Sequence, residues 1–179
     1  MNMNKALPTE VVIYTDGGVE PNPGRGGWAA ILICDKNGKR HEKEITGSEE
    51  NTTNNRMEIL AMLEGLKSLK RPVEATIYTD SQYLQKSIGN WLNGKPVKGT
   101  GWIVGWRSND WSKKTKGDLK NTDLWIKLWV ECERHKSIQV RWVRGHSGDH
   151  YNERCDTLAT EARIGRGWDI IETFIMDHD

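Results

Sequence analysis

The four residues Ile-Tyr-Thr-Asp occur twice in this chain of 179 residues, at 13–16 and at 77–80. Each copy is rich in β-branched and aromatic side chains, which favour a strand, and each runs into turn-forming or helix-starting residues. A long helical pattern separates the copies, so the simplest topology is a strand, a crossover helix and a parallel strand. Asp16 and Asp80 would then emerge at one sheet edge, where ligand sites of open α/β sheets lie.

Each aspartate also has an ordinary structural explanation. Asp16 could open a turn at Gly17-Gly18, and Asp80 could cap the helix that follows it. For either aspartate taken alone, this explanation is the stronger one. The repeat therefore predicts two strands but does not by itself establish a site.

The rest of the pattern predicts a mixed α/β domain. A buried strand returns antiparallel to the first after a turn-rich loop, and a charged strand with the composition of a sheet edge follows it. A core-facing helix with apolar residues at i, i+3 and i+4 spacing then ends before Pro72. The predicted strands are Trp28–Cys34, Lys39–Thr46 and Ile138–Val143, and the further helices are Ser81–Leu92, Asp123–His135 and Glu153–Arg163, with a loop at Asn93–Gly101.

The net charge of +1 argues against a protein that coats nucleic acid uniformly. The charge is uneven, however, because residues 95–120 contain seven lysines and arginines but only two aspartates. Six of the nine tryptophans lie between 91 and 129. Indole faces beside cations can stack on bases while the cations hold phosphates. A satellite core of tryptophans covered by solvated lysines explains the same composition, and both interpretations stay open.

The three cysteines are widely spaced, which fits neither a disulfide framework nor a zinc cluster. Residues 1–8 contain no apolar signal region, and the longest apolar run, Trp28–Cys34, is too short to span a bilayer. We therefore expect a cytoplasmic protein without a membrane segment. A monomer is the default expectation.

Four carboxylates, those of Asp16, Glu58, Asp80 and Asp156, stand at the ends of predicted elements without an obvious basic partner. Glu58 has its own structural explanation, because Asn55 three residues earlier would make a capping box with it. Clustered carboxylates repel one another unless a cation lies among them. Their hard oxygen atoms favour Mg²⁺ or Mn²⁺, and two such ions roughly 3.5–4 Å apart would clamp the attacking and leaving oxygens of a phosphoryl displacement.

Between Val11 and Arg163 the chain resembles the type 1 ribonuclease H family, in its bacterial form with a basic protrusion. Five motifs in the family's order carry the resemblance, and together they outweigh the structural explanation of each carboxylate. They are Tyr14-Thr15-Asp16-Gly17-Gly18, Thr52-Thr53-Asn54-Asn55-Arg56-Met57-Glu58, Tyr78-Thr79-Asp80-Ser81-Gln82-Tyr83, Asp123-Leu124-Trp125, and Gly145-His146-Ser147-Gly148 with Asn152-Glu153-Arg154-Cys155-Asp156.

The resemblance implies a ribonuclease H-like fold, a five-stranded mixed sheet of three antiparallel strands followed by two parallel ones, flanked by helices. It implies a catalytic domain over 1–163, with the protrusion at about 93–121, and a C-terminal extension over 164–179. The implied activity is metal-dependent hydrolysis of the RNA strand of RNA–DNA hybrids, leaving 5′-phosphate and 3′-hydroxyl ends, during replication or repair. Asp16, Glu58, Asp80 and Asp156 would hold two Mg²⁺ ions, with Mn²⁺ as a substitute, and His146 would assist proton transfer or product release.

Substrate contacts follow from the same resemblance. Four amides would read the minor groove and test for a 2′-hydroxyl, and two further residues would form a pocket for a DNA phosphate. The chain departs from the family at Asn51, where relatives often have an arginine of that pocket, and in the longer run Asn93–Gly101. The groove readers are Asn22, Asn54, Asn55 and Gln82, the pocket residues are Thr53 and Asn121, and the protrusion contributes Trp102, Trp106, Lys113, Lys114 and Lys116.

Two other functions are compatible with the same residues. The tryptophan- and lysine-rich segment could support a hybrid-binding module without catalysis, although four unneutralised acids would then weaken the binding of polyanionic RNA. A metal-dependent nuclease or recombinase of the same fold could instead act on DNA.

Overall fold

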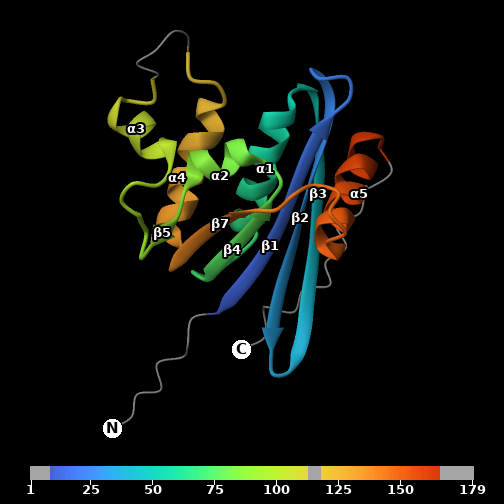
Figure 1. Cartoon of the computed structure of the whole chain (residues 1–179), viewed down its shortest axis with the longest axis horizontal. Helices are drawn as coiled ribbons and strands as arrows, with labels where there is room; N and C mark the ends of the chain where they lie inside the picture. Colours follow the sequence, from blue (N-terminus) through green and yellow to red (C-terminus); the bar gives the residue numbers. More distant parts are fainter. Residues whose placement is uncertain (1–8, 113–117, 166–179) are drawn as a thin grey trace.

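The computed structural model describes residues 9–112 and 118–165, which form one seven-stranded sheet with helices on both faces (Figure 1). The strand order is β3-β2-β1-β4-β7-β5-β6; β1–β2 and β2–β3 are antiparallel, whereas β1–β4 and β4–β7 are parallel. The strands are β1 Glu10–Val19, β2 Gly24–Lys36, β3 Lys39–Thr52, β4 Glu74–Thr79, β5 Trp91–Leu92, β6 Lys95–Pro96 and β7 Ser137–Trp142. The helices are α1 Asn54–Lys67, α2 Gln82–Ile88, α3 Trp102–Ser108, α4 Thr122–Arg134 and α5 His150–Arg163.

The five long strands have the predicted arrangement, three antiparallel and then two parallel. The sheet has seven strands because residues predicted as helix end and loop add the short β5 and β6, which pair antiparallel with each other. β5 also pairs antiparallel with β7. Asn93 and Gly94 make the turn between β5 and β6 with φ of 50° and 74°. Asn-Gly with positive φ at both positions is a two-residue hairpin turn, so this dipeptide is the sequence signal for the extra strands.

The sheet is buried on both faces because alternate residues of its central strands enter different cores. Val11 and Ile13 of β1 belong to the large core under α1 and α4, whereas Val12 and Tyr14 pack with the core under α5. β2 divides in the same way, and this explains why Trp28–Cys34 is apolar without alternation. The site residues contributed by α1 and α5 therefore reach the sheet from opposite faces.

Several elements have other bounds than predicted. β2 begins at Gly24 and ends at Lys36 rather than covering only Trp28–Cys34, and α5 begins at His150 rather than at Glu153. β3 continues to Thr52, six residues past the predicted end at Thr46, because its pairing with β2 continues to Gly24↔Thr52. α2 ends at Ile88 rather than at Leu92, since Gly89 has φ of 65° and leaves the helix.

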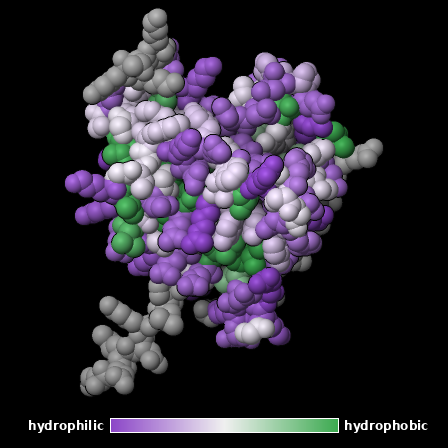
Figure 2. Space-filling model, in the orientation of Figure 1, coloured by the Kyte–Doolittle hydropathy of each residue, from purple (hydrophilic) through white to green (hydrophobic). Residues whose placement is uncertain are grey.

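The face of the molecule in Figure 2 is mainly hydrophilic, and its apolar side chains lie in separate small patches. Among the described residues, no helix is both long and apolar enough to cross a membrane. Lys113, Lys114 and Lys116 and all but the first two residues of the predicted extension 164–179 lie outside the described ranges.

Candidate active site

The two strands of the Ile-Tyr-Thr-Asp repeat are parallel neighbours in register. Tyr14 pairs with Tyr78, and their rings stack with centroids 4.9 Å apart. Asp16 lies two residues further along β1, so the period of two in strands sends its side chain to the face of the stacked rings. Asp80 directly follows the last residue of β4, Thr79. Neither structural explanation applies: Asp16 lies inside β1, which continues to Val19, and the N-cap of α2 is Ser81.

Glu58 enters from α1. The predicted capping box with Asn55 is wrong, because Thr53 is the N-cap and its side chain accepts a hydrogen bond from the Arg56 amide. Helix α1 lies against β1 at Gly17, where a Cβ atom would come within 2.4 Å of the Met57 carbonyl carbon. The glycine therefore permits the close approach that brings the first turns of α1 to the aspartates.

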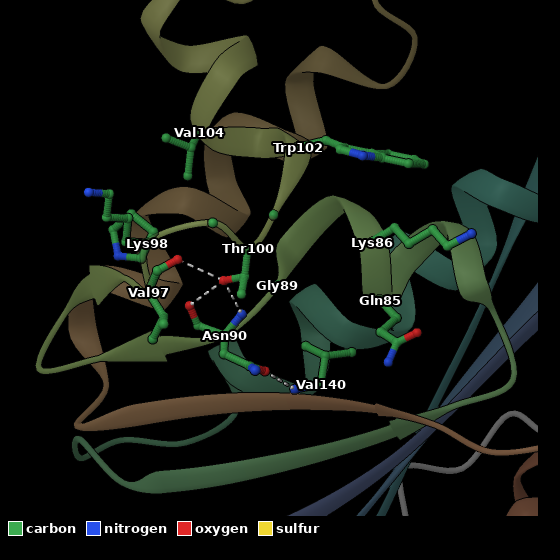
Figure 3. A pocket seen from close by; sticks show the side chains of 13 residues that line it. Gln85, Lys86, Gly89, Asn90, Val97, Lys98, Thr100, Trp102, Val104 and Val140 are labelled. Carbon is green, nitrogen blue, oxygen red and sulfur yellow. Dashed lines mark hydrogen bonds between the residues drawn. The ribbon is translucent and has the colours of Figure 1, made fainter.

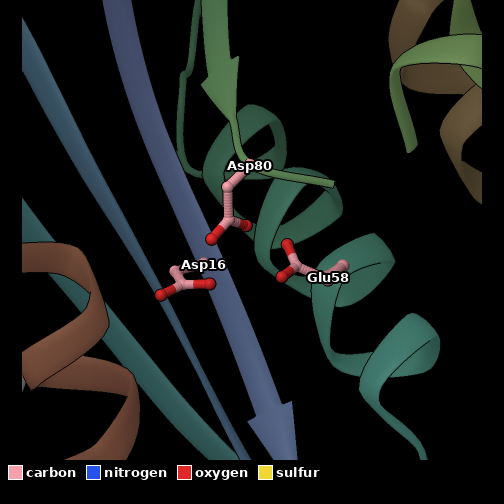
Figure 4. Close-up of side chains that lie close together, drawn as sticks. All are labelled: Asp16, Glu58 and Asp80. Atoms are coloured by element: carbon pink, nitrogen blue, oxygen red, sulfur yellow. The ribbon is translucent and has the colours of Figure 1, made fainter. Parts of the chain in front are cut away.

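Asp16, Glu58 and Asp80 point toward one another in Figure 4, and each offers a ligand oxygen within 4.8 Å of those of the other two. Burial and the Asp80 charge raise the pKa of Asp16 to about 7. Burial and the charges of both aspartates also raise the pKa of Glu58 well above its ordinary value. Burial raises the pKa of Asp80 as well. Three carboxyl groups at this spacing do not ionise together without a neutralising cation.

Asp156 approaches the trio from α5, the helix on the other side of the sheet. The adjacent Cys155 is buried, and its thiol donates to the carbonyl oxygens of Tyr14 and Ala29 at 3.5 and 3.3 Å, which anchors this turn of α5 on β1 and β2. Asp156 lines a small cavity of about 190 Å³ together with Asp16. Its charge contributes to the raised pKa of both aspartates, although it is not one of the three residues with ligand atoms within 4.8 Å.

His146 lies on the exposed loop between β7 and α5, with φ of 54°. The loop comes close to Asp80: a Cβ atom on Gly145 would be 2.9 Å from Asp80 Oδ2. Burial raises the pKa of Asp80, and the charge of His146 opposes this rise. The structure thus places the predicted histidine beside the carboxylate cluster and open to solvent.

A divalent cation fits this cluster. Glu58 Oε2 is buried and has no hydrogen-bond partner among the described residues, an arrangement that is costly unless another group binds the oxygen. All three donors are carboxylates, the hard ligands that Mg²⁺ and Mn²⁺ prefer. Asp16, Glu58 and Asp80 would hold the ion, with Asp156 beside them.

The predicted groove-reading amides are all exposed, and Asn54 lines the small cavity that Asp16 and Asp156 also line. The backbone amide of Asn54 donates to Asn22 Oδ1 at 3.3 Å, and Asn54 Oδ1 accepts from the amide of Val19 at 2.7 Å, so these two side chains lie together at the end of β1. Asn55 is exposed in the first turn of α1, and Gln82 is exposed at the start of α2.

Arg56 connects the two predicted phosphate-pocket residues, a role that the sequence did not reveal. Its backbone amide donates to Thr53 Oγ1 at 3.3 Å, and its Nη1 donates to Asn121 Oδ1 at 3.5 Å. Two further hydrogen bonds, at 3.0 and 2.8 Å, join the guanidinium to Asp123. The forked geometry of this pair holds the starts of α1 and α4 together.

Some of the tryptophans between residues 91 and 129 belong to the core, as one interpretation predicts, whereas Trp102 is exposed, as the stacking interpretation requires. Trp91, Trp125 and Trp129 are buried in the main core, and Trp106 is half-buried against Trp125 with ring centroids 5.2 Å apart. Trp102 is 50% exposed, the largest exposure of these five, and its ring centroid lies 6.4 Å from those of Tyr83 and Trp106.

The comparisons agree with this fold. A crystal structure described as LC9-RNase H1, a type 1 RNase H with the type 2 active-site motif, is similar with a TM-score of 0.73 and 24% identity, over 90% of this chain and 75% of that one. The structure of LC11-RNase H1 in complex with RNA/DNA hybrid is similar with a TM-score of 0.55 and 22% identity, over 87% of this chain and 97% of that one.

Sequence relatives are closer. A ribonuclease H of Cupriavidus pinatubonensis is 48% identical over 150 residues, which are 84% of this chain and 92% of the relative. A ribonuclease H of Caldanaerobacter subterraneus subsp. tengcongensis is 48% identical over 153 residues, covering 84% of this chain and 89% of the relative. The RNase H family model matches residues 8–164. The chain therefore belongs to the ribonuclease H family of enzymes, in the bacterial type 1 class that the five motifs predict.

Proposed function

We propose that this protein is an endonuclease that hydrolyses the RNA strand of RNA–DNA hybrids with two Mg²⁺ ions, leaving 5′-phosphate and 3′-hydroxyl ends. The observation that carries the proposal is the convergence of Asp16, Glu58 and Asp80 within 4.8 Å, in a chain of the ribonuclease H family. Bound divalent ions supply Lewis-acid stabilisation of the charge that develops at the scissile phosphate. Without them, three acids would repel a polyanion.

The chain's own residues have separate roles in this proposal. Asp16 and Glu58 are buried and Asp80 is half-buried. The three provide a rigid set of oxygen ligands, since Asp16 lies in β1, Asp80 directly follows the neighbouring strand β4, and Glu58 comes from a helix fixed at Gly17. Asp156 completes the acidic site from α5. His146 is exposed on the loop beside Asp80, where its imidazole can pass a proton between the site and solvent.

Recognition of the hybrid rests on the polar rim of the site. Asn22, Asn54, Asn55 and Gln82 are exposed amides that can hydrogen-bond to base edges and 2′-hydroxyls in a minor groove. Thr53 and Asn121, connected through Arg56, form the proposed contact for a DNA phosphate. The exposed ring of Trp102 and the lysines at 113, 114 and 116 are proposed to extend this contact along the DNA strand.

The test offers matched RNA–DNA, RNA–RNA and DNA–DNA duplexes with Mg²⁺, then with EDTA. We expect cleavage of the RNA strand of the hybrid alone, with complete loss in EDTA. Asp16→Asn should lower the rate by at least about 100-fold, because it removes a preorganised charged ligand. Cleavage of DNA–DNA would instead support a DNA nuclease, and hybrid binding without cleavage would support a binding module.

Glu153→Gln is the matched control for the Asp16 variant. Glu153 is an exposed carboxylate in the first turn of α5, the helix that carries Asp156, and it does not line the small cavity beside Asp16. This variant should retain the parent rate. Equal losses in both variants would mean that the effect is one of general charge rather than of the carboxylate cluster.

A further inference from the structure

The small cavity beside Asp16 also reaches Arg163, the last residue of α5. Figure 3 shows a larger groove, of about 650 Å³, but none of the four carboxylates is among the described residues that line it. The small cavity differs because Asp16 and Asp156 form part of its wall. Pockets that enclose a whole ligand measure roughly 300–1,000 Å³, so a cavity of about 190 Å³ suits one group of a larger substrate.

One face of α5 forms a wall of this cavity and carries two opposite charges. The residues of that face have the i, i+3, i+4, i+7 spacing of a single helix stripe, and they are Asp156, Ala159, Thr160 and Arg163. Seven residues correspond to about 10 Å along a helix axis. Long side chains on a helix lean toward its N-terminus, which directs the Arg163 side chain back along the cavity. The helix therefore adds a cation to the cavity that the acidic site shares.

The last turn of α5 is fixed on the sheet, so the guanidinium of Arg163 has a defined position. A Cβ atom on Gly27 of β2 would lie 2.5 Å from the Arg163 backbone nitrogen. Arg25 Nε donates a hydrogen bond to the Arg163 carbonyl oxygen. The side chain of Arg163 is 21% exposed. The arginine is thus held at the cavity rather than spread into solvent.

Glu20, in the loop after β1, is a partner of this guanidinium that a substrate can replace. Its Oε2 lies 3.4 Å from Arg163 Nη2, and its own side chain is 81% exposed. Ion pairs at such exposed sites are weak. A phosphate can instead accept two parallel hydrogen bonds from a guanidinium, a stronger arrangement. Glu20 therefore keeps Arg163 in place without blocking an exchange for phosphate.

Arg163 also has a structural explanation, because a cation in the last turn of a helix interacts favourably with the helix dipole. This explanation accounts for a basic residue anywhere in that turn. It does not account for its place on the face that lines the cavity with Asp156.

We propose that Arg163 binds a phosphate of the RNA strand next to the scissile one and thereby seats the scissile phosphate on the carboxylate site. The RNA strand is the one concerned, because Asp16 and Asp156 line the same cavity and the proposed reaction cuts the strand that lies at these carboxylates. Glu20 releases the guanidinium when this phosphate arrives. This inference rests on the proposed function.

The first measurement is binding of a hybrid duplex by fluorescence anisotropy, in an Asp16→Asn background that suppresses turnover. Arg163→Gln should weaken binding by at least about 10-fold, the effect of losing one hydrogen bond to a charged group. It should also lower the slope of log K against log salt by about 0.9, one phosphate contact on a duplex. Arg163→Lys should keep the slope but recover only part of the affinity, because an ammonium does not make the forked contact.

A neutral methylphosphonate, placed at one RNA phosphate at a time, locates the contact. The RNA strand is 2′-O-methylated outside a short window, so that cleavage is confined to that window. Neutralising one phosphate next to the scissile one should lower kcat/KM of the parent by about 10-fold. Arg163→Gln already lacks the contact, so the same substitution should lower its kcat/KM little further.

Glu20→Gln should have the opposite effect to Arg163→Gln. Because Glu20 competes with phosphate for the guanidinium, its removal should tighten binding by up to about 5-fold, the worth of an exposed ion pair. This gain should vanish in the Arg163→Gln background. A pair that only stabilised the loop after β1 would instead make both single variants weaken binding.

Arg154→Gln is the matched control, since Arg154 is also an arginine of α5 paired with a glutamate, Glu44 at 3.0 Å, but does not line the cavity. It should bind hybrid with nearly the parent affinity and salt slope. An unchanged affinity in Arg163→Gln, an equal loss in Arg154→Gln, or equal methylphosphonate effects with and without Arg163 would overturn the inference.

Urea unfolding of each variant separates a lost contact from a lost fold, and Arg163→Lys repeats the comparison if Arg163→Gln does not fold. Cleavage of the unmodified hybrid by the parent tests the proposed function separately. A parent that cleaves hybrid, together with an Arg163→Gln variant that binds and cleaves it equally well, would refute this inference alone.

Discussion

Replacing Asp16 by asparagine should stabilise the metal-free protein while it abolishes the proposed activity. Asp16 is 7% exposed and shares its site with Glu58 and Asp80 within 4.8 Å, so its ionised form is unfavourable in the folded state. The pKa of Asp16 rises from an ordinary 3.8 to about 7. The neutral amide removes this charge, and its oxygen can still accept the hydrogen bond from the Gly17 amide.

The magnitude follows from the pKa shift. A rise of about three pH units corresponds to about 4 kcal/mol of lost stability once the group is ionised in both states. This is an upper limit, because the neighbouring carboxyls can take up a proton instead. Because the pKa of Asp16 is raised in the folded state, the protein is most stable below the ordinary pKa of 3.8, where Asp16 is protonated in both states. This stability is lost as the pH rises from there through the folded-state pKa of about 7. We therefore expect the variant to gain about 2–4 kcal/mol at pH 8.

Urea unfolding in EDTA at pH 8 and pH 5 measures this gain. It should be large at pH 8 and clearly smaller at pH 5, where the folded parent already carries the proton. Adding Mg²⁺ at pH 8 should raise the stability of the parent by mass action and that of the variant much less. A variant less stable than the parent at pH 8 in EDTA would refute the reasoning, because it would show that Asp16 is not held under electrostatic strain.

Two further predictions concern the packing around the site and the core. Gly17→Ala places a methyl group within 2.4 Å of the Met57 carbonyl carbon. It should lower the free energy of unfolding in urea by about 1–3 kcal/mol and lower the rate of hybrid cleavage. A fully stable and active variant would contradict the close approach. Burial lowers the pKa of His135 to about 4, even though Glu131 Oε2 lies 3.8 Å from its Nε2. The neutral imidazole therefore contributes up to about 3 kcal/mol to the free energy of unfolding, in full above pH 6.5. This contribution should be lost as the pH falls toward 4. His135→Gln should flatten this slope, and an unchanged slope would assign it to other groups.

Much of the fold could be predicted from local patterns. The Ile-Tyr-Thr-Asp copies form adjacent parallel strands because β-branched residues and a crossover helix leave few other topologies. The β5–β6 pair was missed although Asn93-Gly94 is a hairpin signal. Its strands have two residues each, and a burial pattern needs longer runs. Strand formation there depends on the free edge of β7, which only the assembled sheet supplies.

The sequence by itself determined the family, the order of the five long strands and the identity of four candidate carboxylates, because motif spacing and periodicity are local properties. The tertiary structure decided which explanation of those carboxylates holds. Asp16 lies inside β1, and Thr53 rather than Asn55 caps α1, which leaves Glu58 free to point inward. It also decided that Trp102 stays open while its neighbours enter the core. These outcomes depend on contacts between residues far apart in the chain, whose geometry no local pattern encodes.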